Sequence, residues 1–180
     1  MDLQSFKSTF RGQVLDPSDA EYQNARRIWN ASVDKRPRLI ARCSGVADVV
    51  AAVDYGRAND LLTSIRGGGH NVGGRALCDD GLVIDLSGMR AVHVNSTERV
   101  VRVQGGTTLG DLDRETHLFG LAVPCGIVPK TGIAGLTLGG GVGWLLRKYG
   151  MSIDNLLSCQ IVTADGRVLN ANSVDHDDLF

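Results

Sequence analysis

The sequence lacks the features that mark several common classes of protein. Its formal net charge is only −1, so it has no basic excess with which to neutralise nucleic-acid phosphates. Residues 1–7 lack the apolar core of a signal peptide. No run approaches the ~18 apolar residues that a membrane span needs. We therefore expect a cytoplasmic protein that binds neither nucleic acid nor membranes.

Cysteines are few and far apart in the sequence. Cys43, Cys78, Cys125 and Cys159 form no C-x-x-C motif and no cluster with histidine at zinc-binding spacing. Free thiols in a reducing cytosol are the expected state of these residues. The sequence therefore predicts no metal site.

Glycine, in contrast, is abundant at 23 residues, and the excess lies in two blocks. The first block is Arg66-Gly67-Gly68-Gly69-His70-Asn71, which follows an apolar run at 61–65 that predicts a buried strand. Three adjacent glycines remove every Cβ from one surface and permit positive φ. Such a loop can direct several backbone N–H groups to one point, which forms a nest for an anion such as pyrophosphate. The histidine then lies at the rim of that nest.

The first part of the chain predicts an α/β arrangement. We expect a helix from about 19 to 31, for which Ser18 and Glu21 have the spacing of a capping box. A strand at 39–42, a helix capped by Ser44 and a second strand at 61–65 should follow. The inner face of the second helix should carry Val46, Val49, Val50 and Val53. Together these elements form a βαβ unit with parallel strands. The first glycine block then lies at the carboxyl end of a strand, where open α/β sheets bind ligands.

The second part predicts a different pattern. Short strands at 82–86, 91–94 and 100–103 have no helix between them. A helix follows at 108–119, capped by Thr108 and stopped by Gly120. Near the end, Asp165-Gly166 between two apolar runs predicts a hairpin. We expect a mixed or antiparallel sheet here, which makes the whole chain α+β.

The second glycine block spans Gly126–Gly143. It is not a Rossmann fingerprint, because no βαβ frame surrounds it and no acidic residue follows at the required distance. With the first block it resembles the FAD-linked oxidases of the vanillyl-alcohol-oxidase and berberine-bridge-enzyme class, especially the bacterial 6-hydroxynicotine oxidase-like enzymes. The matching stretches are 36–43, 66–71, 81–86, 129–143, 148–150 with 154–155, and 162–166.

The resemblance implies a two-lobed PCMH-type FAD-binding domain, with an α/β lobe followed by a lobe of mixed or antiparallel sheet. The predicted divisions are a helical lead-in at 1–34 and the domain at 35–180, with lobes at about 35–95 and 96–180. Pyrophosphate would lie between the lobes. The cofactor-binding residues that the resemblance implies are Arg66, Gly67, Gly68, Gly69, His70, Asn71, Gly74, Pro129, Thr131, Gly132, Gly135, Leu136, Gly139, Gly140, Gly141, Gly143, Tyr149, Asp154 and Asn155.

His70 occupies the position that often carries a covalent bond to flavin in this family. A second link, through cysteine, occurs in some members just before the proline matching Pro129, where this chain has Val128. The resemblance thus implies FAD with a single histidyl link, whereas the alternative for His70 is a histidine that merely caps a turn. Arg66 is equally open between attracting pyrophosphate and an ordinary surface role. Tyr149 could cover the cofactor or pack, and residues 154–155 could bond flavin or cap the next segment.

The implied function is FAD-dependent oxidation, in which hydride leaves an alcohol or amine C–H bond of a small-molecule substrate and electrons pass to dioxygen. The sequence stops at Phe180, where family members continue into a substrate domain. We therefore expect a truncated chain whose catalytic residues are unknown and belong to the missing C-terminal part. One alternative is a non-catalytic or vestigial flavin-binding fragment. Another is an NADPH-dependent reductase of the cell-wall-precursor type with non-covalent FAD, against which His70 argues.

Overall fold

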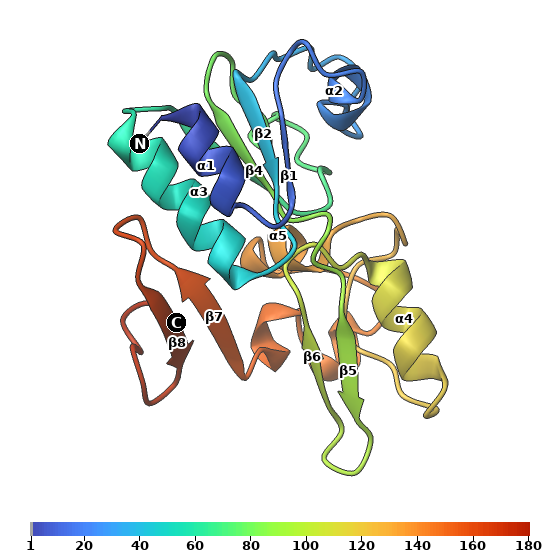
Figure 1. Cartoon of the computed structure of the whole chain (residues 1–180). Coiled ribbons are helices and arrows are strands. Elements are labelled where there is room, and N and C mark those ends of the chain that lie inside the picture. The colour runs from blue at the N-terminus through green and yellow to red at the C-terminus, as the bar shows by residue number, and fades with distance from the viewer. Residues whose placement is uncertain (1) are drawn as a thin grey trace.

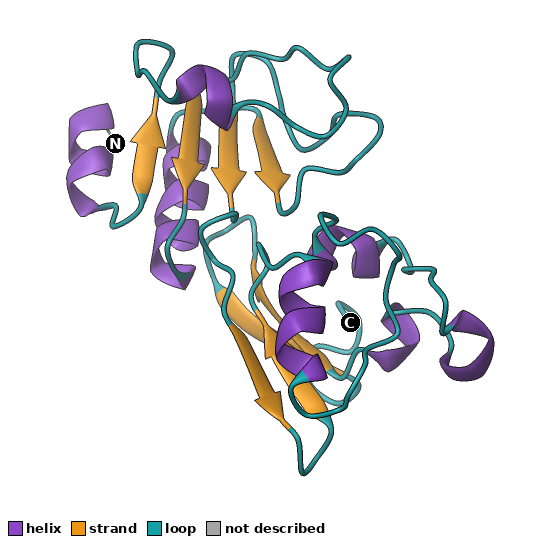
Figure 2. Cartoon of the chain, turned by 90° about the vertical axis from the view of Figure 1, so that its right-hand side faces the viewer, coloured by secondary structure: helices purple, strands orange, loops and turns teal. Residues whose placement is uncertain are grey.

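The computed structural model describes residues 2–180, which form two lobes with separate sheets. Figure 2 shows the first lobe above, with its strands aligned, and the second lobe below it. Figure 1 shows the chain passing from the first lobe to the second after β4. The mixture of helices, parallel strands and antiparallel hairpins confirms the α+β class.

The first lobe contains a four-stranded sheet in the order β1-β2-β4-β3. Its strands are β1 (Gln13–Leu15), β2 (Leu39–Arg42), β3 (Thr63–Arg66) and β4 (Leu82–Asp85). Both β2 and β3 run parallel to β4, whereas β1 is antiparallel to β2. The strands β2 and β3 are therefore parallel as predicted, but β4 lies between them.

The strand predicted at 61–65 forms at Thr63–Arg66, but the prediction that it is buried is wrong. β3 pairs only with β4 and forms an edge of the sheet, so Leu62 and Ile65 are 66% and 62% exposed. The buried strand is β4, in which every residue is buried. A strand with a neighbour on each side and helices over its faces has no route to solvent.

Helices cover both faces of this sheet (Figure 1). On one face, α1 (Leu3–Thr9) and α3 (Val46–Ala58) pack over a core that includes Phe6, Leu39 and Ile84. On the other face, α2 (Tyr22–Ala25) packs over Ile40 and Val83. The helix predicted at 19–31 is therefore only four residues long.

Two local hydrogen-bond patterns differ from the predicted caps. Before α2, Ser18 donates its hydroxyl to Asp16 and so belongs to a turn rather than to a helix cap. The N-cap of α3 is Gly45, because the Ser44 hydroxyl donates to the buried carboxylate of Asp48. The same carboxylate accepts the backbone N–H groups of residues 11, 12 and 44, and it thereby joins α3 to the start of β1.

The inner face of α3 also differs in part from the prediction. Val46, Val49 and Val53 are partly buried against the core, as expected, whereas Val50 is not among the side chains that pack on it. The buried apolar side chains of this helix are Ala52 and Tyr55. The helix connects β2 to β3 and so completes the predicted βαβ unit.

The second lobe contains two separate antiparallel hairpins. The first pairs β5 (Val92–Asn95) with β6 (Val100–Val103), and the second pairs β7 (Ser158–Val162) with β8 (Val168–Asn172). The second hairpin confirms the turn predicted at Asp165-Gly166. The division into lobes at about residue 96 remains a prediction, and it crosses the β5–β6 hairpin.

Short helices complete this lobe: α4 (Leu109–His117), α5 (Ile133–Leu138), α6 (Leu146–Tyr149) and a 3₁₀ turn at Ile153–Asn155. Its core is formed by Leu109 and Leu112 of α4 with Ile133 of α5, packed against valines of the first hairpin. The second hairpin contacts the first lobe, since Arg57 of α3 donates to the Ala164 carbonyl at 3.4 Å.

The two lobes also meet where their glycine blocks touch. A Cβ placed on Gly68 would lie 2.2 Å from the backbone N of Gly132, and one on Gly132 would lie 2.3 Å from the N of Gly68. No side chain fits between backbones at this separation. The two glycines are thus required by the contact between the segments, before any ligand is considered.

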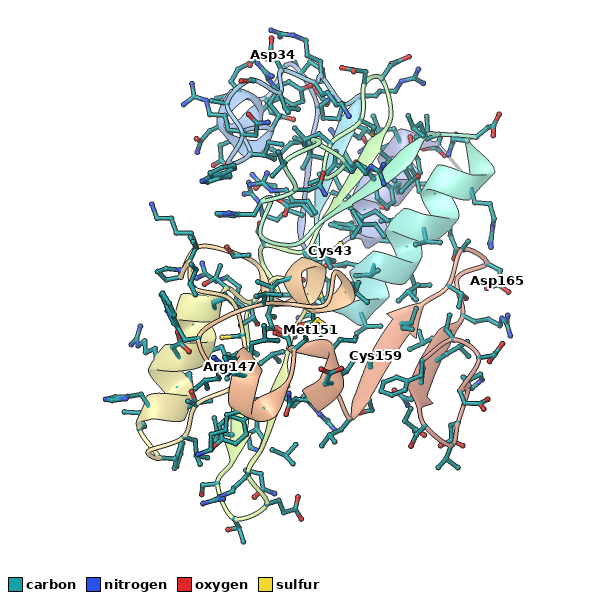
Figure 3. The ribbon with its side chains drawn as sticks, turned by 180° about the vertical axis from the view of Figure 1, so that it is seen from behind. Asp34, Cys43, Arg147, Met151, Cys159 and Asp165 are labelled. Atoms are coloured by element: carbon teal, nitrogen blue, oxygen red, sulfur yellow. The ribbon has the colours of Figure 1, made fainter. Side chains whose placement is uncertain are left out.

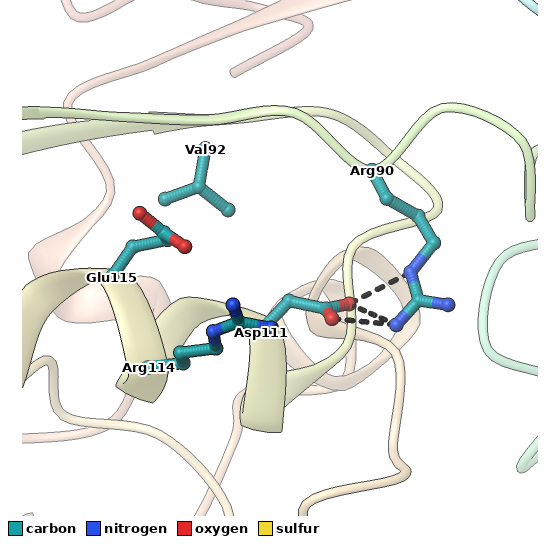
Figure 4. A pocket seen from close by; sticks show the side chains of 5 residues that line it. All are labelled: Arg90, Val92, Asp111, Arg114 and Glu115. Atoms are coloured by element: carbon teal, nitrogen blue, oxygen red, sulfur yellow. Dashed lines mark hydrogen bonds and ion pairs between the residues drawn. The ribbon is translucent and has the colours of Figure 1, made fainter.

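The predicted cap of α4 is confirmed, and its aspartate also pairs with Arg90, which precedes β5. Thr108 accepts the N–H of Asp111, whose carboxylate accepts the N–H of Thr108 in return, forming a capping box. Arg90 donates to both oxygens of the Asp111 carboxylate (Figure 4). Burial of this carboxyl raises its pKa, but the hydrogen bonds from Arg90 and Thr108 lower it more, to about 2.

Replacing Asp111 should therefore destabilise the fold in a pH-dependent way. We expect Asp111→Ala to lower the free energy of unfolding by about 1–2 kcal/mol at pH 7, from the lost cap and ion pair. Because the folded-state pKa is depressed, the deficit should persist above the ordinary value of 3.8 and shrink as the pH falls toward about 2. Urea denaturation across this range measures it. Asp113→Ala, an exposed acidic position on the same helix, is the control, and an equal effect there would contradict the assignment.

The glycine contact gives a second prediction. Gly68→Ala should lower the free energy of unfolding by about 3 kcal/mol, because the methyl group forces the two backbones apart. Gly135→Ala is the matched control: a Cβ there meets nothing within 4 Å, so it should be neutral or stabilise α5 by up to about 1 kcal/mol. Equal urea midpoints for the two variants would show that a methyl group at position 68 does not destabilise the fold, which would contradict this prediction.

Candidate functional site

The site forms around the contact between Gly68 and Gly132, and His70 is its central side chain. The imidazole Nδ1 lies 3.5 Å from the Thr131 hydroxyl, which comes from the second glycine block. The Trp29 indole stacks on the ring with centroids 5.5 Å apart and 21° between the planes. The structure thus brings His70 and Thr131, two predicted site residues, directly together. Trp29 was not predicted to be at the site.

The environment of His70 favours its neutral form. Burial of the ring lowers its pKa below the ordinary value of 6.5, and the positive charge of Lys130 lowers it further. A neutral imidazole keeps a lone pair on one ring nitrogen, which is the form that acts as a nucleophile.

Arg66 interacts with the protein rather than with open solvent. Its guanidinium donates to the Ala25 carbonyl at the end of α2, and its Nε lies 3.9 Å from the Asp85 carboxylate. Arg42 of the neighbouring strand approaches the same carboxylate to 3.5 Å. Asp85 is fully buried and in register with both arginines, so one carboxylate links the ends of three strands.

Sequence reasoning missed this cluster of Arg42, Arg66 and Asp85. The available signal was the single charged residue at the end of an otherwise apolar run, Leu82–Asp85. An ionised carboxylate within a buried strand requires a positive partner. The two arginines that supply it precede Asp85 by 43 residues (85 − 42) and 19 residues (85 − 66) in the sequence.

Asn71 and Gly74 shape the turn that follows the first block. The Asn71 side chain accepts the N–H of Arg75 at 3.0 Å, and its carbonyl accepts the N–H of Gly74 at 3.1 Å. Gly74 has φ +68°, and a Cβ on it would lie 2.8 Å from Val33. Both residues therefore have a structural role that is sufficient to explain them, while their contact with cofactor stays a prediction.

The second block begins as a connection between α4 and α5. The Pro129 and Thr131 carbonyls accept the N–H groups of Gly110 and Leu109, at 2.8 and 2.9 Å. Leu136 packs from α5 against the core of the second lobe. These contacts fix the segment that places the Thr131 hydroxyl beside His70.

The glycines after Gly132 divide into packed and open positions. A Cβ on Gly141 would lie 2.3 Å from Ser152, and one on Gly143 would lie 1.7 Å from the Cys125 carbonyl. Gly140 has φ +98°, which strongly favours glycine. In contrast, Gly135 and Gly139 are exposed and leave their backbone open to a ligand.

The predicted residues Tyr149, Asp154 and Asn155 lie in one loop and form hydrogen bonds within it. Asp154 accepts the N–H of Met151 at 2.8 Å, and the Asn155 amide donates to the Tyr149 carbonyl at 2.8 Å. Figure 3 shows Met151 and Arg147 in this region, between α4 and β7. The loop meets the second block through backbone bonds from residues 152 and 153 to Gly141 and Gly140.

Other features of the described chain lie apart from these blocks. The hollow drawn in Figure 4, about 300 Å³, is lined by Arg90, Val92, Asp111, Arg114 and Glu115, none of which belongs to either block. Within residues 2–180, no three His, Cys, Asp or Glu side chains gather as a metal site would require. The helices of the same residues include none with the length and apolar character of a membrane span. All four cysteines are free thiols.

The residues at the site fit the binding of a flat, phosphate-bearing cofactor. The first block meets the start of the second at Gly68 and Gly132, and Gly135 and Gly139, further along the second block, are exposed. The same part of the chain exposes large apolar side chains, with Leu138 80% and Val142 62% exposed. An aromatic ring system can cover such surface, while backbone N–H groups near Gly68 suit an anion.

Comparison with known proteins identifies the family. A family model described as an FAD binding domain matches residues 37–172. The chain is 41% identical over 172 residues to (R)-6-hydroxynicotine oxidase of Paenarthrobacter nicotinovorans, covering 96% of this chain and 38% of that protein. It is 38% identical over 179 residues to an FAD-linked oxidoreductase of Dictyostelium discoideum, covering 99% of this chain and 39% of the relative. The chain thus spans well under half the length of these relatives.

Solved structures agree with this result. The crystal structure of 6-hydroxy-D-nicotine oxidase from Arthrobacter nicotinovorans superposes with a TM-score of 0.93 at 40% identity, over 94% of this chain and 38% of that one. The berberine-bridge-enzyme-like protein 1 of Physcomitrella patens gives 0.92 at 32% identity, over 99% and 39%. The resemblance inferred from the two glycine blocks is thereby confirmed. The chain belongs to the FAD-binding domain family of the FAD-linked oxidoreductases, and its two lobes have the PCMH-type fold.

Proposed function

We propose that this chain provides the flavin-binding part of an FAD-dependent oxidase. The observation that supports the proposal is the backbone contact of Gly68 with Gly132, which brings the loop of His70 against the segment that carries Thr131. FAD would lie with its pyrophosphate at the first block, between the lobes, and its ring system along the second. When bound, the flavin supplies the redox chemistry: it takes hydride from an alcohol or amine C–H bond and passes electrons to dioxygen.

The names of the relatives support this substrate range. One similar protein is an oxidase of 6-hydroxynicotine, and others among the solved structures are a chitooligosaccharide oxidase and a pollen protein with glucose dehydrogenase activity. The first name gives an amine as substrate, and the other two give sugars, which carry alcohol groups. The groups that select the substrate are not assigned to any residue of this chain.

We further propose that His70 forms a single covalent bond to the flavin. Its neutral imidazole supports attack on the 8α-methyl carbon. Bond formation would join an imidazole nitrogen to that carbon and break one methyl C–H bond and the imidazole N–H bond; the two electrons and two protons released would be taken up by the flavin and then by dioxygen, which would become peroxide. A cysteinyl bond is disfavoured, because Val128 has no nucleophile and burial raises the pKa of the Cys125 thiol to about 11.

A second candidate function is flavin binding without turnover. The polar side chains favour this candidate because they are already used within the protein rather than directed at a substrate. Hydrogen bonds within the protein are made by Arg66, Asn71, Asp154 and Asn155. Peroxide release from an alcohol or amine separates the two candidates when this chain replaces the matching 38% of (R)-6-hydroxynicotine oxidase, because the chain spans only that part of the relative.

The free thiols also support the proposal of a reducing, cytoplasmic location.

Attachment at His70 can be tested by acid precipitation. After incubation with FAD, the wild-type chain should keep its yellow colour in the precipitate, whereas His70→Ala should release all of its flavin to the supernatant. His93→Ala is the matched control, since that histidine is exposed on β5, and it should behave as wild type. Free flavin in the wild-type supernatant would exclude the covalent bond, although not flavin binding itself.

The open glycines can be tested separately from folding. Gly135→Val should lower flavin affinity at least tenfold, because its side chain fills surface that the ring system would cover. Unfolding should change by less than about 1 kcal/mol, since the position has no neighbours within 4 Å. Fluorescence titration with FAD measures the affinity. Unchanged binding would remove α5 from the proposed cofactor surface.

A further inference from the structure

Residues 26–35, between α2 and β2, run alongside the first glycine block and the turn after it. We call this segment the strap. The backbone N–H of Trp29 donates to the Gly69 carbonyl at 3.1 Å, and the Asn30 amide donates to the Val72 carbonyl at 2.8 Å. Because the strap bonds carbonyl groups on both sides of His70, it restrains the backbone that carries this residue.

The contacts continue beyond the glycine loop. Lys35 donates to the carbonyls of Gly74 and Leu77, each at 3.1 Å, and Val33 packs so closely on Gly74 that no Cβ fits there. The pairing therefore extends along most of the strap instead of resting on one bond. It also accounts for Gly74 without reference to a ligand.

The two ends of the strap are also bonded to each other. Arg26, at its beginning, forms an ion pair with Asp34 and donates to the Lys35 carbonyl at 3.2 Å. A segment fixed at both ends loses less conformational freedom when it holds another loop in place. The strap thus has the construction of a rigid support.

The exposure of Trp29 separates its role from that of a core residue. Its side chain is 62% exposed, so it contributes little to the buried core of either lobe. Its ring nevertheless stacks on His70, with centroids 5.5 Å apart and the planes nearly parallel at 21°. The indole covers one face of the imidazole, while the Thr131 hydroxyl lies 3.5 Å from Nδ1 at its edge.

We propose that Trp29 is a positioning residue for His70, holding the imidazole in one orientation for bond formation to the flavin. This inference rests on the proposed covalent bond. A ring stacked on one face and contacted at one edge samples few orientations, so a larger fraction of encounters brings a nitrogen to the flavin carbon in line. In this proposal Trp29 neither contacts the reacting carbon nor takes part in electron transfer. Its effect passes through the orientation of His70.

The test compares Trp29→Ala with Trp29→Phe in the full chain. Acid-stable flavin should form about tenfold more slowly in Trp29→Ala after FAD is added, and Trp29→Phe, which keeps a stacking ring, should restore most of the rate. Phe119→Ala is the control, because that ring is 51% exposed beyond the end of α4. Thermal unfolding of each variant shows whether the chain remains folded.

A second readout, made without flavin, is the NMR titration of the His70 ring. Trp29→Ala should raise the pKa of His70 toward its ordinary value by admitting water to the ring, while the charge of Lys130 remains. Trp29→Phe should stay close to wild type. A role confined to stability would move the unfolding temperature but not this titration.

These readouts separate the two proposals. If no variant retains flavin after acid, the covalent bond is excluded, and the titration still decides whether Trp29 controls His70. If the wild type retains flavin and Trp29→Ala matches it in both attachment rate and titration, the positioning role is excluded.

Discussion

The approach of Gly68 to Gly132 is the constraint on which the rest of the site depends. Two backbones from different lobes meet where neither can carry a side chain. Each lobe has its own apolar core, so the cores alone do not determine how the lobes are joined. The glycine contact does so, together with the contacts of the second hairpin with α3. It also brings the loop after β3 next to the segment before α5, so the geometry that joins the lobes is the geometry that forms the site.

The ends of the parallel strands show a second constraint, which is electrostatic. Asp85 lies between Arg42 and Arg66, and Glu21 lies 3.7 Å from Arg42. The group has two charges of each sign, so it supplies little net field to attract an anionic ligand. Its effect is to hold the ends of β2, β3 and β4 in register beneath the loop. Under the proposed function, attraction of a phosphate would then depend on the backbone N–H groups of the glycine block, whose dipoles act at short range.

The parts of this structure that could be predicted from sequence have local causes. The α4 capping box follows from a threonine and an aspartate three residues apart, the second hairpin follows from Asp165-Gly166, and β2 follows from a short apolar run. The joint occurrence of two glycine blocks was sufficient to recognise the family. In contrast, the placement of β4 between β2 and β3 depends on pairing across the chain. The hydrogen bond to the Ala25 carbonyl at the end of α2, the pairing of Asp85 with Arg42 and the stacking of Trp29 likewise depend on residues about forty positions away. No pattern within a window of ten residues contains that information.

The strap changes where the functional unit begins. The family match starts at residue 37, yet β1, α2 and the segment that holds the glycine loop all precede it. A domain excised at the family boundaries would retain every glycine of both blocks and lose the support of the first. Its sheet would also have β2 as a newly unpaired edge, since β1 covers that strand here. For protein engineering, the smallest piece of this chain that can be expected to present His70 correctly therefore begins before β1.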